Sequence, residues 1–180
     1  MNLSFLTKLL VLRLRARFYE SARVKIGKKC TFEKNVSIKL TGNVSSTVVI
    51  GDRTSVCTGV QLITEGGNIT IGSYCTINPY CMLYGNGGLT IGNNVRIATH
   101  TVIVAGNHIF SSRDLPICEQ GISTKGIKID DDVWIGCNCS ILDGVHIKKG
   151  CVIGAGSVVT RSTEEYGVYV GNPAKLIKKR

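Results

Sequence analysis

Residues 129–159 read IDDDVWIGCNCSILDGVHIKKGCVIGAGSVV, and an aliphatic residue stands at every sixth position of this stretch. The same spacing occurs in six runs along the chain, each with three apolar positions six residues apart. The runs are Ile26, Phe32 and Ile38; Ile50, Val56 and Leu62; Ile71, Ile77 and Leu83; Ile91, Ile97 and Ile103; Ile129, Ile135 and Ile141; and Ile147, Ile153 and Val159. Repetition at a fixed period is typical of a solenoid, in which each repeat buries its apolar side chain against its neighbours.

A period of six does not fit a helix, but it fits a short strand followed by a turn. Three such units form one triangular coil, and stacked coils bury a continuous apolar column. Adjacent strands lie about 4.8 Å apart, so six coils form a prism roughly 29 Å tall. The spacing therefore predicts an all-β fold, a parallel β-helix of about six triangular coils over residues 24–160.

The spacing also locates four insertions. Extra residues follow the third strand of a coil at 41–47, 64–68 and 84–88, and a long excursion covers about 106–126. Because all four fall at one corner of the stack, they predict a shelf along one edge of the prism. Long loops on a rigid scaffold commonly carry function.

At 180 residues the chain is long enough for one domain with a full core. It contains no apolar stretch of membrane-spanning length. The apolar residues 9–12 are followed by Arg13 and by no small-residue cleavage site, which argues against a signal peptide. We expect a cytoplasmic protein, or one that is peripheral at the inner face of the membrane.

The eight cysteines favour a reduced compartment over a disulfide framework. Five of them fall at the small interior positions of the repeat, where cysteine acts as a compact apolar residue: Cys30, Cys75, Cys81, Cys139 and Cys151. Cys57, Cys118 and Cys137 do not. No two cysteines form the Cys-x-x-Cys pair typical of zinc sites, so no metal site is expected.

The net charge of +10 is concentrated at the two ends of the chain. Residues 1–25 carry six basic side chains and Glu20, giving +5, and residues 175–180 carry four basic side chains, giving +4. The body between them is only +1, which does not suit a nucleic-acid surface. Anionic small molecules or membrane headgroups fit this distribution better.

Residues 4–23 are predicted to form a basic amphipathic helix within an N-terminal segment, residues 1–23. The pattern rests on Phe5, Leu6, Leu9, Leu10, Leu12, Leu14 and Phe18 among Lys8, Arg13, Arg15 and Arg17. Such a helix would cap the open end of the prism or lie in a membrane interface. Residues 161–180 are expected to form a short C-terminal tail.

Of the three histidines, His108 is the candidate general base. His100 lies at a turn within a coil, and His146 on the outer face of a strand, whereas His108 falls where the long loop leaves the prism. A histidine at the root of a loop is positioned by the scaffold yet accessible, and imidazole suits proton transfer near neutral pH. The alternative is a solvated loop histidine without a catalytic role.

Beyond His108, three further motifs follow in order: DVWIG at 132–136, IGAGSVVT at 153–160 and GNPA at 171–174. This ordered set resembles the hexapeptide-repeat acyltransferases. Within them it is most similar to the galactoside and maltose acetyltransferase-like branch and the capsule and O-antigen polysaccharide O-acetyltransferases. The resemblance implies a left-handed β-helix, a homotrimer, and acetyl-CoA-dependent transfer to a hydroxyl of a sugar or surface-polysaccharide precursor. The loop sequence of residues 108–121 favours glycan biosynthesis.

The resemblance also implies roles for individual residues. His108, 17 residues after Ile91, would take the hydroxyl proton, and Asn78, 13 residues before Ile91, would orient the acceptor. Trp134 would wall the acceptor pocket of an adjacent subunit, and the Cys137 N–H would stabilise the oxyanion. Acetyl-CoA, the acetyl donor, would meet Cys137, Ala155, Thr160, Arg161, Lys178 and Lys179, without any metal.

Several alternatives remain open at this point. The nearest is an N-acetyltransferase acting on a nucleotide-linked aminosugar, which also needs a base and coenzyme A. A covalent route through Cys118, in the loop of His108, is a further possibility. Two alternatives involve no acyl transfer. One is a zinc enzyme like the γ-carbonic anhydrases, although the three histidines are poorly spaced for its metal site. The other is a non-catalytic β-helix scaffold.

Overall fold

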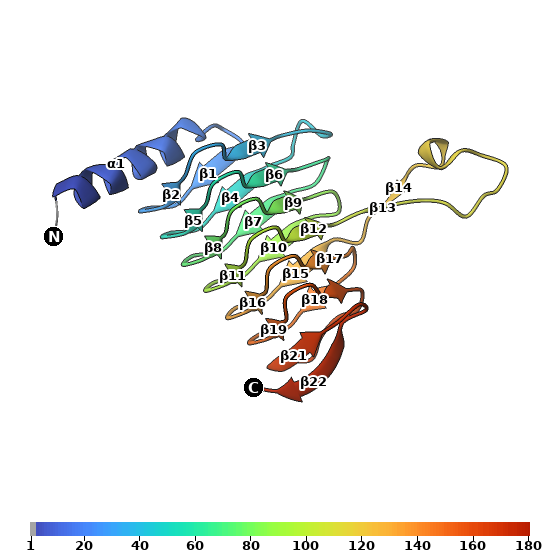
Figure 1. The fold of residues 1–180 in the computed structure, drawn as a ribbon. Coiled ribbons are helices and arrows are strands. Elements are labelled where there is room, and N and C mark those ends of the chain that lie inside the picture. Colours follow the sequence, from blue (N-terminus) through green and yellow to red (C-terminus); the bar gives the residue numbers. More distant parts are fainter. Residues whose placement is uncertain (1–2) are drawn as a thin grey trace.

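The computed structural model describes residues 3–180, apart from the side chains of residues 3–6 and 8. The chain forms a three-sided stack of short parallel strands with one helix at its beginning and a hairpin at its end (Figure 1). The helix α1 spans Leu3–Phe18 and lies at the β1–β3 end of the stack. A long excursion projects from the middle of the stack (Figure 1).

Three parallel sheets form the sides of the prism. The first sheet contains β1 (Val24–Ile26), β4 (Val48–Ile50), β7 (Ile69–Ile71), β10 (Leu89–Ile91), β15 (Ile127–Ile129) and β18 (His146–Ile147). The second contains β2 (Thr31–Phe32), β5 (Ser55–Val56), β8 (Thr76–Ile77), β11 (Arg96–Ile97), β16 (Trp134–Ile135), β19 (Val152–Ile153), β21 (Gly167–Val170) and β22 (Lys175–Lys179). The third contains β3 (Ser37–Lys39), β6 (Gln61–Ile63), β9 (Met82–Tyr84), β12 (Val102–Val104), β17 (Ser140–Ile141) and β20 (Val158–Val159).

The strand register confirms the predicted repeat. Each aliphatic anchor pairs with its counterpart in the next coil; in the first sheet, for example, Ile26 pairs with Ile50 and Ile50 with Ile71. Sixteen of the eighteen repeat positions are buried, and the other two, Ile26 and Ile38 of the first coil, are partly buried. The fold is the β-helix of about six coils that the six-residue spacing predicts, because each coil buries one aliphatic side chain per strand.

The insertions share one corner, as predicted. We name the corners in chain order: the first joins the first and second sheets, the second joins the second and third, and the third joins the third sheet to the next coil. The third corner holds residues 40–47, 64–68, 85–88 and 105–126. The last of these contains the hairpin β13 (Asn107–His108) and β14 (Ile122–Ser123) and the short helix η1 (Ile117–Glu119).

The cysteines occupy the environments that the repeat predicts. The five interior cysteines are buried, Cys57 and Cys137 are half-buried, Cys118 is exposed, and all eight are free thiols. Burial raises the pKa of Cys57 and of Cys81 to about 11. These two thiols therefore stay protonated at neutral pH and act as packing groups.

The N-terminal end of the prism is covered by the last turn of α1. Ala16 is buried, the Tyr19 ring lies 5.3 Å from that of Phe32, and the Tyr19 hydroxyl donates to the Val36 carbonyl at 2.6 Å. The helix ends at Phe18, five residues before the expected end, and residues 19–23 form a turn that leads into β1. Phe5, Leu6 and Lys8, which supported the helix prediction, have side chains outside the described part.

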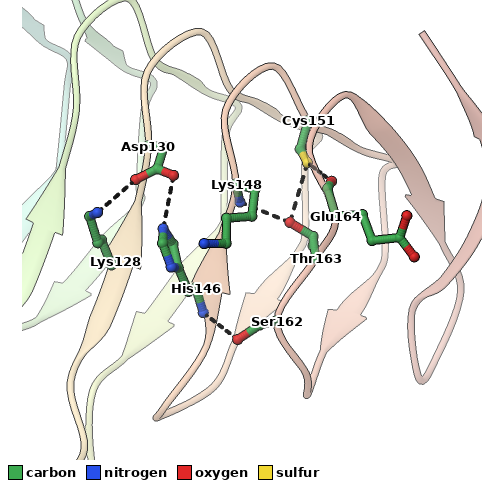
Figure 2. Close-up of polar contacts among 8 residues, drawn as sticks. All are labelled: Lys128, Asp130, His146, Lys148, Cys151, Ser162, Thr163 and Glu164. Carbon is green, nitrogen blue, oxygen red and sulfur yellow. Dashed lines mark hydrogen bonds and ion pairs between the residues drawn. The ribbon is translucent and has the colours of Figure 1, made fainter.

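The C-terminal end is covered by the segment predicted as a tail. Residues 162–164 run beside β18: the His146 N–H donates to Ser162 Oγ at 3.0 Å, and the Lys148 N–H to Thr163 Oγ1 at 2.8 Å (Figure 2). The antiparallel pair β21–β22 then extends the second sheet. At this end the edges of the first and second sheets are thus covered by other segments of the chain. No helix among residues 3–180 is long and apolar enough to cross a bilayer.

Ile141 and Ile38 provide a test of the packing, because both lie in the third sheet but only Ile141 is fully buried. We expect Ile141→Ala to lower the free energy of unfolding by about 2–5 kcal/mol, and Ile38→Ala by clearly less. Urea unfolding followed by circular dichroism measures both values. Equal losses would contradict the inference that the interior column holds the fold together.

Candidate active site

His108 stands at the root of the hairpin that leaves the third corner. Its strand, β13, pairs antiparallel with β14, where Asn107 is opposite Ser123 and His108 opposite Ile122. The hairpin continues outward with a bond from the Ile109 N–H to the Gly121 carbonyl at 3.0 Å. Two strands from one excursion therefore fix the backbone of His108 while leaving its side chain exposed.

The insertions of the third corner meet around His108. A pocket of about 240 Å³ is lined by Glu65, Tyr84, Asn86, Val104, Gly106, Asn107, His108 and Ile122. Glu65 comes from the 64–68 insertion, Asn86 from the 85–88 insertion and His108 from the excursion. The shelf predicted from the spacing is thus a shallow site built by three successive coils.

The imidazole of His108 has no partner within the described part of the chain. Among the described residues it forms no hydrogen bond and no ion pair, so both ring nitrogens are open to a ligand. Glu65 is the one acidic side chain that lines the same pocket in the described part of the chain, and its backbone takes the left-handed conformation, with φ of 43°. The pocket therefore brings together an imidazole and a carboxylate.

Asn86 is a residue of this pocket that sequence reasoning missed. Its Oδ1 is buried and has no hydrogen-bond partner within the described residues. A buried amide oxygen without a partner is costly, so the Asn86 amide is a strained polar group at the wall of the pocket. Gly106 leaves room for this side chain, since a Cβ at Gly106 would lie only 3.0 Å from the Asn86 Cβ. The signal available in the sequence was the 84–88 insertion itself.

The residues assigned to the acceptor and the oxyanion lie on a different side of the prism. Asn78, Cys137 and Ala155 lie at the second corner, one coil or more apart. Trp134 lies on β16, the strand that precedes Cys137. Asn78 Nδ2 donates to the Ile97 carbonyl at 2.8 Å, which holds its side chain along the stack. None of these residues lines the His108 pocket of the same chain.

Trp134 on the second sheet is exposed, and Cys137 at the second corner has a backbone donor that is unpaired among the described residues. Trp134 points outward from the second sheet, as predicted, and 56% of its surface is exposed. The backbone N–H of Cys137 has no hydrogen-bond acceptor within the described part, although its neighbours Gly136 and Asn138 both donate to adjacent coils.

The remaining candidate coenzyme A residues differ in whether their side chains already have partners. Thr160 and Arg161 are exposed where β20 ends at the third corner, and within residues 3–180 Arg161 and Lys178 form no ion pair. Lys179 is already paired: its Nζ lies 2.7 Å from Glu164 Oε2, and this hydrogen bond raises the pKa of Lys179. Lys179 thus contacts the segment that precedes β21.

The other two histidines have structural contacts. The His100 ring stacks on Tyr80 at the second corner, with ring centroids 5.3 Å apart. His146 Nε2 lies 2.9 Å from Asp130 Oδ2, and Lys128 Nζ lies 3.1 Å from Asp130 Oδ1 (Figure 2). Although partial burial opposes it, hydrogen bonding to His146 and Lys128 lowers the pKa of Asp130. Within residues 3–180 no three His, Cys, Asp or Glu side chains are grouped to hold a metal.

Sequence comparisons match both the repeat and most of the chain. A model of the bacterial transferase hexapeptide family (six repeats) matches residues 126–161. The putative lipopolysaccharide biosynthesis O-acetyl transferase WbbJ of Escherichia coli strain K12 is 31% identical over 170 residues, which are 90% of this chain and 81% of that protein.

Other curated relatives are longer than this chain. A probable acetyltransferase of Mycobacterium tuberculosis is 33% identical over 133 residues, which are 74% of this chain but 42% of that protein. The chain spans about half the length of this and three further acetyltransferases, from 42% to 62%.

Solved structures of AntD, an N-acyltransferase from Bacillus cereus, share the fold. The complex of AntD with dTDP and 3-hydroxybutyryl-CoA superposes with a TM-score of 0.75 at 27% identity, over 100% of this chain and 89% of that one. A mutant of AntD in complex with dTDP-4-amino-4,6-dideoxyglucose and coenzyme A gives the same TM-score, 0.75. The repeat, the β-helix and the match to WbbJ over 81% of its length show that this chain belongs to the hexapeptide-repeat acyltransferase family.

Proposed function

We propose that the protein is a cytoplasmic, acetyl-CoA-dependent O-acetyltransferase that acts on a hydroxyl of a sugar or surface-polysaccharide precursor. The observation that carries this proposal is the unpartnered His108 side chain in the pocket built by three insertions. WbbJ, which is named for O-acetyl transfer in lipopolysaccharide biosynthesis, supports the acceptor class. AntD complexes that contain coenzyme A or an acyl-CoA support the donor class.

The proposed chemistry is a direct transfer. The acceptor hydroxyl attacks the thioester carbonyl of acetyl-CoA while a ring nitrogen of His108 takes its proton. The carbonyl oxygen becomes an oxyanion, which a backbone N–H can stabilise, and the free N–H of Cys137 is a suitable donor. Collapse of the tetrahedral intermediate releases coenzyme A thiolate, which recovers the proton from His108. No acyl-enzyme forms, so Cys118 has no part in the reaction.

Asn86 adds an acceptor contact that the family resemblance did not supply. Asn86 lines the pocket, and its side-chain amide can form a hydrogen bond with a second hydroxyl of a sugar. Holding the sugar by a hydroxyl that does not react orients the reacting one toward His108. Glu65, in the same pocket, is placed to orient either the sugar or the imidazole.

We further propose that the complete site lies between copies of the chain in a homotrimer. In one copy, His108 lies at the third corner, whereas Asn78 and Cys137 lie at the second and Trp134 lies on β16 of the second sheet. A cyclic assembly apposes unlike surfaces of neighbouring copies, and three-sided prisms can place a third corner beside a second corner. Trp134 would then cover the acceptor beside the partner's histidine.

The second candidate is N-acyl transfer to a nucleotide-linked aminosugar. The similarity to AntD over the whole chain favours it, since AntD is an N-acyltransferase whose mutant has been solved with a dTDP-linked aminosugar. An amine needs the same base and the same thioester. The two candidates therefore differ in the acceptor and not in the role of His108.

His108→Asn should lower kcat about 10²- to 10⁴-fold, because it removes the base and leaves the pocket shape nearly unchanged. His146→Asn is the matched control, since His146 contacts Asp130 on the first sheet, away from the second corner and from the His108 pocket. Release of coenzyme A thiol in the presence of acceptor measures the rate. Full activity in His108→Asn would refute the assignment of the base.

An acceptor panel separates O-transfer from N-transfer. We expect product with oligosaccharides or sugars that carry free hydroxyls, and none that depends on an amine, as judged by mass spectrometry and by the alkali lability of an ester. In the same assay Asn86→Ala should raise the KM for the acceptor about tenfold, because one hydrogen bond to the sugar is lost. An amide product formed only with nucleotide-linked aminosugars would replace the leading proposal with the second.

Mixing two inactive variants tests the shared site. If His108 of one copy works with Asn78 of its neighbour, co-refolded His108→Asn and Asn78→Ala chains should recover about one quarter of the wild-type activity, since a quarter of randomly paired interfaces hold both native residues. Each variant refolded alone is the control. Activity no greater than the mean of the two variants, or a monomer in light scattering, would contradict the proposal.

A further inference from the structure

The helix α1 has two apolar sides that face in opposite directions. With about 100° of rotation per residue, Leu9, Leu12, Ala16 and the following Tyr19 share one side, and Leu10, Val11, Leu14 and Phe18 share the other. The first side faces the prism, where Ala16 is 3% exposed and Tyr19 packs against Phe32. The apolar residues of α1 thus do not form the single stripe expected for a cap.

The second side is open to solvent. Leu10 is 58% exposed, Leu14 48% and Phe18 86%, and Val11 is also exposed. We call these four residues the outer face. A helix that is apolar on both sides is normally covered on both sides, and the prism covers only one. We therefore expect the outer face to be covered by a partner other than the prism of the same chain.

Basic side chains surround the outer face. By helical position Arg13 and Arg17 lie along one border and Arg15 along the other. A groove of about 470 Å³ runs beside Leu10 and Leu14, and Arg13 and Arg17 line it together with Lys28 and Lys29 from the first corner. Within the described part none of these cations forms an ion pair.

The positive charge of the α1 end of the protein indicates which kind of partner would cover the outer face. Residues 1–30 carry eight basic side chains and Glu20, which gives +7 of the net +10. If the same end of a second copy covered the outer face, like charges would be in contact. If residues 31–174 of a second copy covered it, their net charge of only −1 would attract this end weakly. A bilayer with anionic lipids provides both an apolar layer for the outer face and phosphates for the cations.

We propose that the α1 end of the protein is a docking surface for an anionic membrane. The outer face enters the interface between headgroups and acyl chains, and Arg13, Arg15 and Arg17 contact phosphates on either side. Lys28 and Lys29 bind headgroups at the groove. The prism then stands on the bilayer by its first coil.

Vesicle sedimentation tests this with the full chain. The protein should bind vesicles made of equal parts phosphatidylglycerol and phosphatidylcholine, but not pure phosphatidylcholine vesicles, and raising the salt concentration should weaken binding. Lys28→Gln/Lys29→Gln should weaken it about thirtyfold. The matched control is Lys148→Gln/Lys149→Gln, which removes the same Lys-Lys pair from the first corner of the last coil.

A second variant addresses the apolar contact. Leu14→Gln/Phe18→Gln should weaken vesicle binding at least about tenfold without lowering the melting temperature, because both side chains are exposed in the free protein. Absence of binding to the anionic vesicles would overturn the proposal, as would equal loss in the Lys148→Gln/Lys149→Gln control. Vesicle binding that survives both test variants, or a change in oligomer size caused by Leu14→Gln/Phe18→Gln without any vesicle binding, would do the same.

Discussion

The interior of the prism accepts one aliphatic side chain from each strand of each coil, and the rest of the structure depends on that constraint. Ile97, for example, pairs with Ile77 on one side and Ile135 on the other, and all three are fully buried. A residue inserted within a strand would turn the following side chains out of this column. Insertions are therefore confined to corners, where the chain can leave the stack and return in register. The position of the functional loops follows from the packing of the core.

The same constraint explains why the fold could be predicted so fully from the sequence. A period of six is visible in one chain without any alignment, since each Ile, Val, Leu or Phe marks both a strand and its neighbours in the stack. The register also predicted which cysteines point into the interior and which corner carries every insertion, and the structure confirms both predictions. The ends of the chain lack this period. The hairpin β21–β22 and the segment beside β18 were for that reason not predicted.

The candidate site was predicted only in part, for a physical reason. His108 was found because it stands at a departure from the register. Asn86 stands at another, but an asparagine in a short loop has no pattern of its own, and its significance lies in a buried oxygen that only coordinates reveal. Asn78 was chosen from the resemblance, and the structure places it at a different corner. A one-dimensional spacing records how far apart residues are along the chain, and it does not say which corners of two copies would meet.

Because the scaffold is rigid and its coils are equally spaced, the functional surfaces of one chain lie at fixed heights along the prism. His108 leaves the fourth coil, and the α1 end precedes the first, so about three strand spacings, roughly 14 Å, separate the base from the level of the first coil. A protein that stands on a bilayer by its α1 end would hold His108 above the headgroups by at least about that distance, because α1 lies between the first coil and the bilayer. An acceptor bound at the third corner would then be reached from the aqueous side, where acetyl-CoA is also found. The repeat that builds the core would thereby also set the distance between the membrane surface and the chemistry.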